Sequence, residues 1–267
     1  MTSVSAVAAL SQRRISLTAR TPRQIVVPLM TPILFALVIA PALKQALGGL
    51  HQHVDYTAFV SIGTVGLLVP LTAIFAGLSV IVDRSAGAQR ELLAAPVPRG
   101  LLVIGNLIVA LGVATLQVLV LMGVSLARGS HFHTSASGLL WFVGAALLFT
   151  TFMYGVAEVL AARLPKQEEY IGATPAVAVL PWFFAGALFP IAALPGALTA
   201  FAKVLPLTHA LALMRYGLLG DGGAGLHDIW GMSDTTAMAG LSLAVVAVFA
   251  IGFTVLAVRV FSRSALN

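Results

Sequence analysis

The segment from Leu101 to Leu126 contains no charged side chain over 26 consecutive residues. A helix rises about 1.5 Å per residue, so about 20 apolar residues suffice to cross the ~30 Å hydrocarbon core of a bilayer. Composition agrees, because 59% of the 267 residues are hydrophobic and only 9% are charged, whereas soluble domains carry about 25% charged residues. The sequence therefore predicts a multi-pass membrane protein rather than a soluble protein with one large core.

Six segments are long and apolar enough to span, with the approximate bounds 25–43, 58–82, 101–126, 138–162, 170–190 and 236–258. Pro28 and Pro32 lie close to the start of the first segment, where proline is better tolerated. Pro175 and Pro181 interrupt the fifth, which predicts a kink there. The predicted fold class is an all-α membrane protein with six transmembrane helices.

The basic residues are distributed unevenly between the two sides that six spans define. One side holds only Lys44, Arg128, Lys203 and Arg215. The other side holds Arg13, Arg14, Arg20, Arg23, Arg84, Arg90, Arg99, Arg163, Lys166, Arg259 and Arg263. The positive-inside rule then places both termini and the Asp83–Arg99 loop in the cytoplasm of a plasma-membrane protein. The pI of 10.3 does not indicate nucleic acid, because the basic residues flank apolar runs.

The first 24 residues carry four arginines and no acid, without the apolar core of a cleaved signal peptide. Their apolar residues alternate with Gln12, Arg13 and Arg14. This pattern predicts an amphipathic helix on the cytoplasmic leaflet, with arginines toward anionic head groups. A disordered basic tail is the alternative.

The loop DRSAGAQRELLAAPVPR, from Asp83 to Arg99, is the one long charged segment between apolar runs. Gly87 opens a stretch of high helix propensity from Ala88 to Ala95, and Pro96 ends it. Such a helix would be about 12 Å long, too short for a domain but long enough to insert into a partner's groove. Its contacts would come from Arg90, Glu91, Leu92 and Leu93. An ordinary interfacial loop is the other interpretation.

The segment from Leu180 to Tyr216 is apolar but divided by Pro190, Pro195 and Pro206. Pieces of 10–15 residues are too short to span and are typical of re-entrant or interfacial helices. Its aromatic residues would lie near the outer interface: Trp182, Phe183, Phe184, Phe189 and Phe201. A proline-rich hydrophobic loop is the alternative.

Together the two segments resemble those of the permease subunits of type-2 ABC exporters, the ABC-2 type transmembrane proteins of the daunorubicin-resistance kind. The cytoplasmic loop matches at Asp83, Arg84, Gly87, Leu92, Leu93, Pro96 and Arg99. The outer segment matches at Gly186, Phe189, Pro190, Pro195, Pro206, Leu207, Thr208 and Arg215. One departure is Ser85, where relatives often have an acid.

The resemblance implies a cytoplasmic amphipathic segment over 1–24 and an ABC-2 type transmembrane domain over 25–267. It implies no catalysis and no cofactor or metal in this chain, since ATP and Mg²⁺ would bind two partner ABC ATPase subunits; the chain has no phosphate-binding loop motif. A second permease copy or paralogue would complete the transporter. The implied ATPase-coupling residues are Asp83, Arg84, Gly87, Arg90, Glu91, Leu92, Leu93, Pro96 and Arg99. The implied outer re-entrant gate residues are Phe189, Pro190, Pro195, Pro206, Thr208 and Arg215.

The central part of every predicted span lacks Asp, Glu, Lys and Arg. An ion path usually needs such residues, whereas a lipid-like cargo does not. We therefore expect export of a hydrophobic or amphiphilic compound, such as a drug, a polyketide or a lipid, as in multidrug efflux and antibiotic resistance. The alternatives are an ATPase-independent secondary transporter or channel, and an intramembrane enzyme that would use Glu158, Asn106 or Gln117.

Three further features have simple interpretations. Glu158 lies about one turn from the end of its span, so its side chain is expected to reach the interface, although a gating or proton-transfer role stays open. The two His-x-His pairs, at 51–53 and 131–133, could bind Zn²⁺ or Cu²⁺ only if their loops met. The glycine-rich stretch 220–225 predicts a flexible loop.

Overall fold

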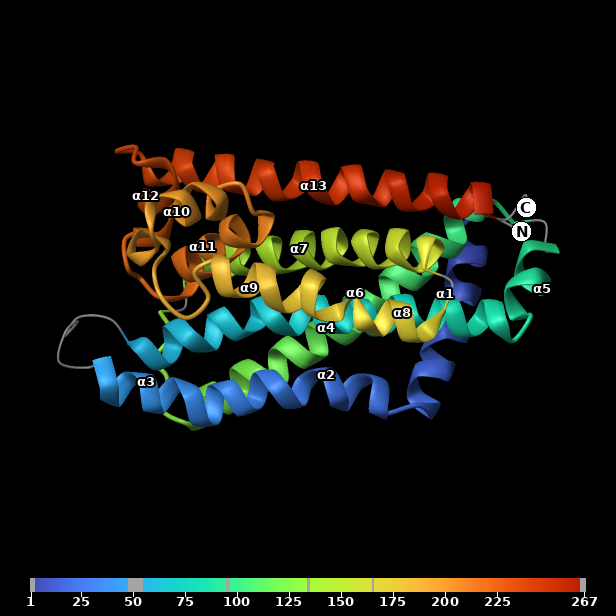
Figure 1. Ribbon diagram of the computed structural model, residues 1–267, viewed down its shortest axis with the longest axis horizontal. Coiled ribbons are helices and arrows are strands. Elements are labelled where there is room, and N and C mark those ends of the chain that lie inside the picture. The colour runs from blue at the N-terminus through green and yellow to red at the C-terminus, as the bar shows by residue number, and fades with distance from the viewer. Residues whose placement is uncertain (1–2, 48–54, 95–96, 134, 165, 265–267) are drawn as a thin grey trace.

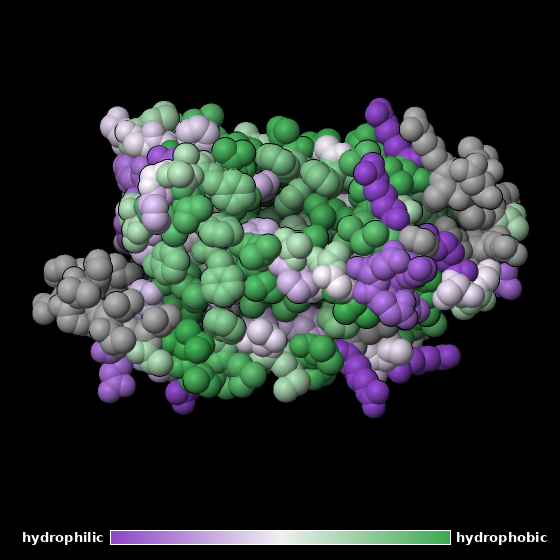
Figure 2. All heavy atoms as spheres, in the orientation of Figure 1, coloured by the Kyte–Doolittle hydropathy of each residue, from purple (hydrophilic) through white to green (hydrophobic). Residues whose placement is uncertain are grey.

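The computed structural model describes residues 3–47, 55–94, 97–133, 135–164 and 166–264. Within these residues the protein is helical and contains no strand, which confirms the predicted all-α class. The long helices lie side by side along the longest axis of the molecule (Figure 1). Apolar residues form a continuous band around the middle of the visible face, and hydrophilic residues gather toward the two ends (Figure 2). This distribution is typical of a bundle surrounded by lipid.

Five helices in the described residues are long and apolar enough to cross a membrane, or six if one bent helix pair counts as a span. The first combines α2 (Arg23–Leu34), a π-helical turn (Phe35–Ile39) and α3 (Ala40–Leu47). The other four are α4 (Tyr56–Ser85), α6 (Arg99–Ala127), α7 (Ala136–Arg163) and α13 (Thr235–Ser264).

The segment predicted as the fifth span consists of three short pieces. They are α8 (Gln167–Gly172), a π-helical turn (Pro175–Val179) and α9 (Leu180–Phe184). The helix is irregular where the sequence places Pro175 and Pro181, because proline offers no N–H to the helical ladder. The first two pieces pack against α4, and the three lie along the middle of the bundle (Figure 1).

The short helices gather at the two ends of the bundle. At one end lie α1 (Ser3–Arg20) and α5 (Ala88–Ala94), together with the end of α13; we call this the α5 end (Figure 1). At the other lie a 3₁₀ turn (Ile191–Ala193), α10 (Gly196–Ala202), α11 (Pro206–Leu218) and α12 (Ala224–Trp230); we call this the α12 end. The described chain therefore starts and finishes at the same end of the bundle (Figure 1).

Helix α4 is the core of the bundle. In its most apolar window 67% of the residues are buried, against 22% in the first span and in α13. It packs against α2, α6, α7 and α11. Large apolar side chains on the peripheral helices stay exposed, for example Leu119 and Val248. Such side chains are suited to contact lipid, and α4 is suited to hold the other helices in place.

Gly63 on α4 permits a very close approach of the chain that follows α9. A Cβ atom at this position would lie 2.1 Å from the carbonyl oxygen of Ala187 and 3.1 Å from the Arg215 guanidinium. Small residues commonly allow such close backbone contact between membrane helices. This close contact holds the chain that follows α9 against α4 at the α12 end.

We expect Gly63→Ala to destabilise the protein, because the added methyl group must displace the backbone around Ala187. Overpacking of this kind costs about 1–3 kcal/mol. The matched control is Gly112→Ala on α6, where a Cβ atom meets nothing within 4 Å. Thermal unfolding of the purified protein should show a lower midpoint for the first variant only. Equal midpoints for the two variants would contradict the close contact.

Candidate functional site

The loop between α4 and α6 contains the short helix α5, from Ala88 to Ala94. Gly87 separates α5 from α4 with a φ of +78°, a left-handed conformation that glycine adopts without steric cost. Pro98 is the residue before the first turn of α6. The chain thus leaves α4, forms α5 and enters α6 at the same end of the bundle (Figure 1).

The predicted coupling residues in this loop point in different directions. Glu91 is exposed on α5. Leu92 is half-buried and lines a small pocket of about 30 Å³ together with Leu10 and Arg13 of α1. The side chains of Arg90 and Leu93, and all of Pro96, lie outside the described residues. Of the α5 side chains described, Glu91 is therefore the polar one available to a partner.

Residues flanking α5 contact their own chain. Arg84 Nη2 donates a hydrogen bond to the carbonyl oxygen of Ala161 at 3.3 Å. Arg99 Nη1 donates to the carbonyl oxygen of Ser262 near the end of α13, at 2.8 Å. Ser85, which stands where relatives often have an acid, is exposed and donates to the carbonyl of Val82 in its own helix. These contacts hold the ends of α4 and α6 against α7 and α13.

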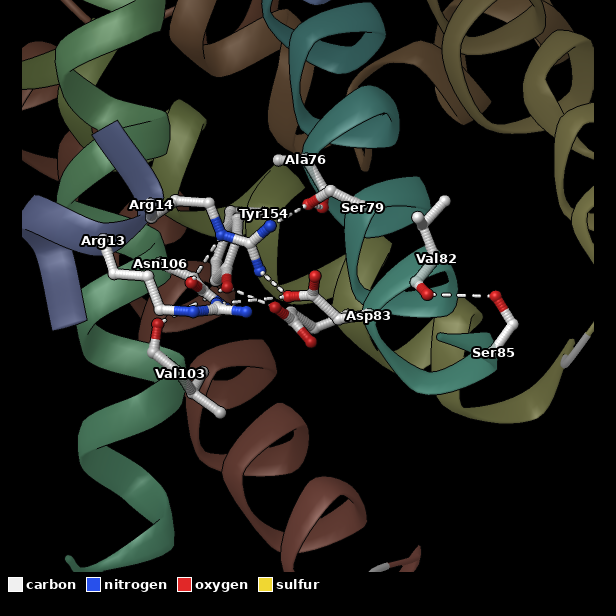
Figure 3. Close-up of polar contacts among 11 residues, drawn as sticks. Arg13, Arg14, Ala76, Ser79, Val82, Asp83, Ser85, Val103, Asn106 and Tyr154 are labelled. Carbon is white, nitrogen blue, oxygen red and sulfur yellow. Dashed lines mark hydrogen bonds and ion pairs between the residues drawn. The ribbon is translucent and has the colours of Figure 1, made fainter. Parts of the chain in front are cut away.

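Arg14 of α1 forms the most extensive polar cluster at the α5 end (Figure 3). The side chain is buried, with Arg14 only 8% exposed. Its Nε donates to Asn106 Oδ1 at 2.9 Å and its Nη1 to Ser79 Oγ at 2.9 Å. Its Nη2 contacts Asp83 Oδ2 at 2.8 Å, and Arg13 lies 3.5 Å from the same oxygen. One guanidinium therefore bonds to both helices that flank α5.

This cluster changes the interpretation of α1. An amphipathic helix was predicted, and α1 does form, but Arg14 bonds to the protein rather than pointing to head groups. Helix α1 also packs closely along α6, where Ser11 Oγ donates to the carbonyl of Gly105 at 3.3 Å. Asp83 likewise faces α1 instead of solvent. The sequence contained one signal for this contact, because Arg13, Arg14 and Asp83 were all assigned to the same side of the membrane.

Glu158 lies close to this cluster and does not extend to the membrane surface. The residue is 4% exposed, and its carboxylate accepts a hydrogen bond from the Tyr154 hydroxyl one turn earlier on α7. The Tyr154 hydroxyl is also 3.4 Å from the carbonyl oxygen of Val103 on α6. The expectation that Glu158 reaches the interface is wrong, because the residue is buried within the protein and bonded to Tyr154.

Arg215 forms a second buried cluster, at the α12 end. The residue is 5% exposed. Its Nη1 donates to the Gly186 carbonyl at 2.7 Å, and its Nη2 donates to the Ala187 carbonyl at 2.8 Å. The guanidinium also lies 3.5 Å from the centre of the Phe59 ring. Tyr56 adds a hydrogen bond from its hydroxyl to the Leu188 carbonyl. Arg215 therefore fastens the turn after α9 to the start of α4.

The structure brings together only part of the predicted outer gate. Phe189, Pro190 and Pro195 are exposed. Pro206 is the first residue of α11, where its missing N–H costs nothing. Thr208 is buried on α11, and its hydroxyl has no hydrogen-bond partner in the described part of the chain. Of the predicted gate residues, those buried like Arg215 are thus Pro206 and Thr208, both on α11.

Helices α10 and α11 form a sharp bend of 80° at the same end. This pair is the one broken span or re-entrant element found among the described residues, since the two helices are long and apolar enough only together and are bent at a short break. Both helices are too short to cross a bilayer alone. The bend and the Arg215 cluster lie in the segment between α9 and α13, where the sequence predicts the outer element.

The remaining candidate sites are not supported as metal or catalytic centres. No group of three or more His, Cys, Asp or Glu in the described residues could hold a metal ion. His51 and His53 lie outside the described residues. Gln117 is fully buried and bridges helices, donating to the Ile25 carbonyl at 2.6 Å and accepting from Thr72 at 2.5 Å. Its hydrogen bonds are those of a structural residue.

Comparison with known proteins gives one consistent assignment. Residues 5–219 match the family described as ABC-2 type transporter. The chain is 28% identical over 196 residues to Nodulation protein J of Rhizobium meliloti (strain 1021), covering 72% of this chain and 73% of that protein. It is 25% identical over 195 residues to Nodulation protein J of Rhizobium leguminosarum bv. viciae, covering 72% and 74%. The family match includes both buried arginine clusters.

Proposed function

The chain belongs to the ABC-2 type transporter family, and from this premise we propose that it is the permease subunit of an ATP-driven exporter. In this proposal the energy comes from two ABC ATPase subunits, and a second permease copy or paralogue completes the path. Both termini and α5 face the cytoplasm. The ATP and Mg²⁺ belong to the ATPase subunits, and this chain binds no cofactor.

The observation that carries the proposal is the placement of α5. The helix projects between α4 and α6 at the α5 end, and Glu91 on it is exposed. Arg14 bonds to Ser79 and Asp83 before α5 and to Asn106 after it. A force applied to α5 by a moving partner would therefore reach α1, α4 and α6 together. Such a connected element is what coupling between two distant sites requires.

The proposed cargo is a hydrophobic or amphiphilic compound. The most apolar windows of the long helices contain at most two charged residues each. The charged residues of α4, α6 and α13 lie at helix ends, for example Asp83, Arg99 and Arg259. Glu158 is bonded to Tyr154 and enclosed. A path with these walls favours a lipid-like solute over an ion.

We expect Glu91→Arg to separate the permease from its ATPase. In the proposed docking Glu91 faces a basic surface of the ATPase, so an arginine brings like charges together, which costs several kcal/mol, and each 1.4 kcal/mol lowers affinity about tenfold. Co-purification with the ATPase subunit should fall at least about tenfold. The fold should be unchanged, because Glu91 is exposed. The matched control is Glu168→Arg, which reverses an exposed acid on α8. Unchanged co-purification of Glu91→Arg would contradict the proposed docking.

A transport measurement tests the function directly. Cells that express the permease with its ATPase should accumulate less of a lipophilic cargo than cells that lack either one. Transport that persists without any ATPase would favour the secondary transporter or channel. Equal accumulation of several lipophilic dyes and drugs in all cells would count against this class of cargo.

A further inference from the structure

A single run of hydrogen bonds at the α12 end connects four helices through His209. His209 on α11 is 3% exposed, and Ser242 on α13 is fully buried. His209 Nδ1 lies 3.1 Å from Ser242 Oγ, and His209 Nε2 lies 2.9 Å from the carbonyl oxygen of Lys203, directly after α10. Trp230 Nε1 on α12 donates to the same Ser242 Oγ at 2.8 Å. We call these residues the His209 network.

The chemistry of the two ends fixes the direction of two of the three bonds in the His209 network. The indole N–H of Trp230 can only donate, and the carbonyl of Lys203 can only accept. His209 Nε2 must therefore carry a proton and donate it to Lys203. The Ser242 hydroxyl, which accepts from Trp230, is then free to donate to His209 Nδ1. The observed geometry is thus satisfied by a neutral imidazole with its proton on Nε2.

The network acts on the bend between α10 and α11. Lys203 directly follows α10, and α11 begins three residues later at Pro206, so the Lys203 carbonyl lies within the 80° bend. His209, near the start of α11, donates a hydrogen bond to this carbonyl. Through Ser242 it also connects the carbonyl to α13 and α12. The His209 and Trp230 rings also pack together, with centroids 5.6 Å apart. The bend is thereby tied to the long helix α13.

We propose that His209 is a positioning residue that fixes the bend between α10 and α11, and that protonation of its ring releases the bend. A second ring proton at Nδ1 would point at Ser242 Oγ, which already accepts a hydrogen bond from Trp230. That oxygen can accept a second hydrogen bond, so the cost of the proton is the positive charge that it places on a ring only 3% exposed. A conformation that exposes the ring to water binds the proton more readily, so falling pH favours that conformation.

The groups around the ring do not supply a counter-charge through hydrogen bonds. Both ring nitrogens are bonded to neutral oxygens, those of Lys203 and Ser242. The titratable or charged residues on the surrounding elements at this end are Asp55 and Tyr56 at the start of α4, His131 and His133 before α7, Lys203 after α10, Arg215 and Tyr216 on α11, Asp221, His227 and Asp228 around α12, and Asp234 before α13. In the orientation proposed above this end faces outside, so the relevant pH is the external one.

The absence of cysteine from the sequence allows a direct distance measurement. Leu198→Cys on α10 and Thr236→Cys on α13 introduce two exposed thiols for spin labels. The distance between the two labels is measured by double electron–electron resonance on the full-length protein in lipid nanodiscs, at pH 8 and at pH 5. We expect one narrow distance at pH 8 and a second, longer distance at pH 5. As the pH falls through the range in which an imidazole titrates, the ratio of the long-distance to the short-distance population should rise by up to about tenfold per pH unit.

His209→Gln in the same labelled protein provides the decisive comparison. A glutamine amide can donate to Lys203 and accept from Ser242, but it does not titrate between pH 5 and 8. We expect the single narrow distance at both pH values in this variant. His227→Gln on α12, which removes an exposed imidazole, should keep the pH response of the parent protein. Ser242→Ala should show the longer distance at both pH values, with Ser233→Ala as its exposed control.

Two results would overturn the inference. One is an unchanged distance distribution in the labelled parent protein between pH 8 and pH 5. The other is a pH response in His209→Gln equal to that of the parent protein. The inference makes the bend between α10 and α11 responsive to external pH. It rests in part on the proposed function, which places this end outside the cell. The distance measurement needs neither ATPase nor cargo, so either idea can fail without the other.

Discussion

Replacing Arg14 with methionine is expected to release α1 from the bundle. The variant keeps most of the side-chain volume but removes the guanidinium that bonds to Ser79, Asp83 and Asn106. Removing one partner of a buried, hydrogen-bonded ion pair costs about 3–5 kcal/mol. Arg13 remains near Asp83 at 3.5 Å, so we expect the lower end of that range. Hydrogen exchange of the α1 amides should then accelerate about a hundredfold.

Two further variants make this result specific. Arg20→Met removes an exposed positive charge from the same helix and should leave α1 exchange close to the parent value. Arg14→Met combined with Asp83→Asn should cost less than the sum of the single changes, because the two residues contact each other. Slow α1 exchange in Arg14→Met would show that apolar packing along α6, rather than the Arg14 cluster, holds α1 in place.

The long helices could be predicted from the sequence because their signal is local. The predicted span 101–126 corresponds to α6, which runs from Arg99 to Ala127. The predicted span 138–162 corresponds to α7, which runs from Ala136 to Arg163. Run length and the absence of charge decide such elements, and neither depends on the rest of the fold. The short helix α5 was predictable for a similar reason, since Gly87 and Pro96 bound a stretch of high helix propensity.

The partners of the buried polar residues could not be predicted. Arg14 and Asp83 lie 69 positions apart, and the sequence offered anionic head groups as an equally good partner for an arginine on an amphipathic helix. Glu158 was misplaced for the same reason, because its proximity to a helix end suggested snorkelling. The structure instead buries it beside Tyr154, whose hydroxyl also lies 3.4 Å from the Val103 carbonyl oxygen of α6. Pairings across long sequence separations depend on helix packing, which periodicity alone does not determine.

The two arginine clusters act on opposite ends of α4. Arg14 bonds to Ser79 and Asp83 near its C-terminal end, and Arg215 contacts Phe59 near its N-terminal end. Between them α4 is the most buried of the long helices. A displacement at the α5 end would therefore be carried by a helix that is rigidly packed along its length. This arrangement gives the proposed transporter a physical connection between the ATPase side and the bent element at the α12 end.

Arg215→Leu is expected to free the turn after α9 and abolish transport. The substitution removes the donors to the Gly186 and Ala187 carbonyls, which are held in the interior. Each buried acceptor left without a partner costs about 1–3 kcal/mol. Loss of the contact with the Phe59 ring adds about 1–2 kcal/mol. Hydrogen exchange of the amides between residues 185 and 191 should accelerate, and efflux should fall to the level of cells without the permease.

A graded series distinguishes the guanidinium from its charge alone. Arg215→Lys keeps the charge but presents a single ammonium group, which cannot reproduce the planar fork that binds two carbonyls while lying over an aromatic ring. We expect this variant to resemble Arg215→Leu, and Phe59→Leu to have a smaller effect, because it leaves both carbonyl bonds in place. Lys203→Met, which removes an exposed charge near the bend, is the control. Normal exchange and transport in Arg215→Lys would mean that positive charge at this position suffices, and that the fork geometry does not hold the turn.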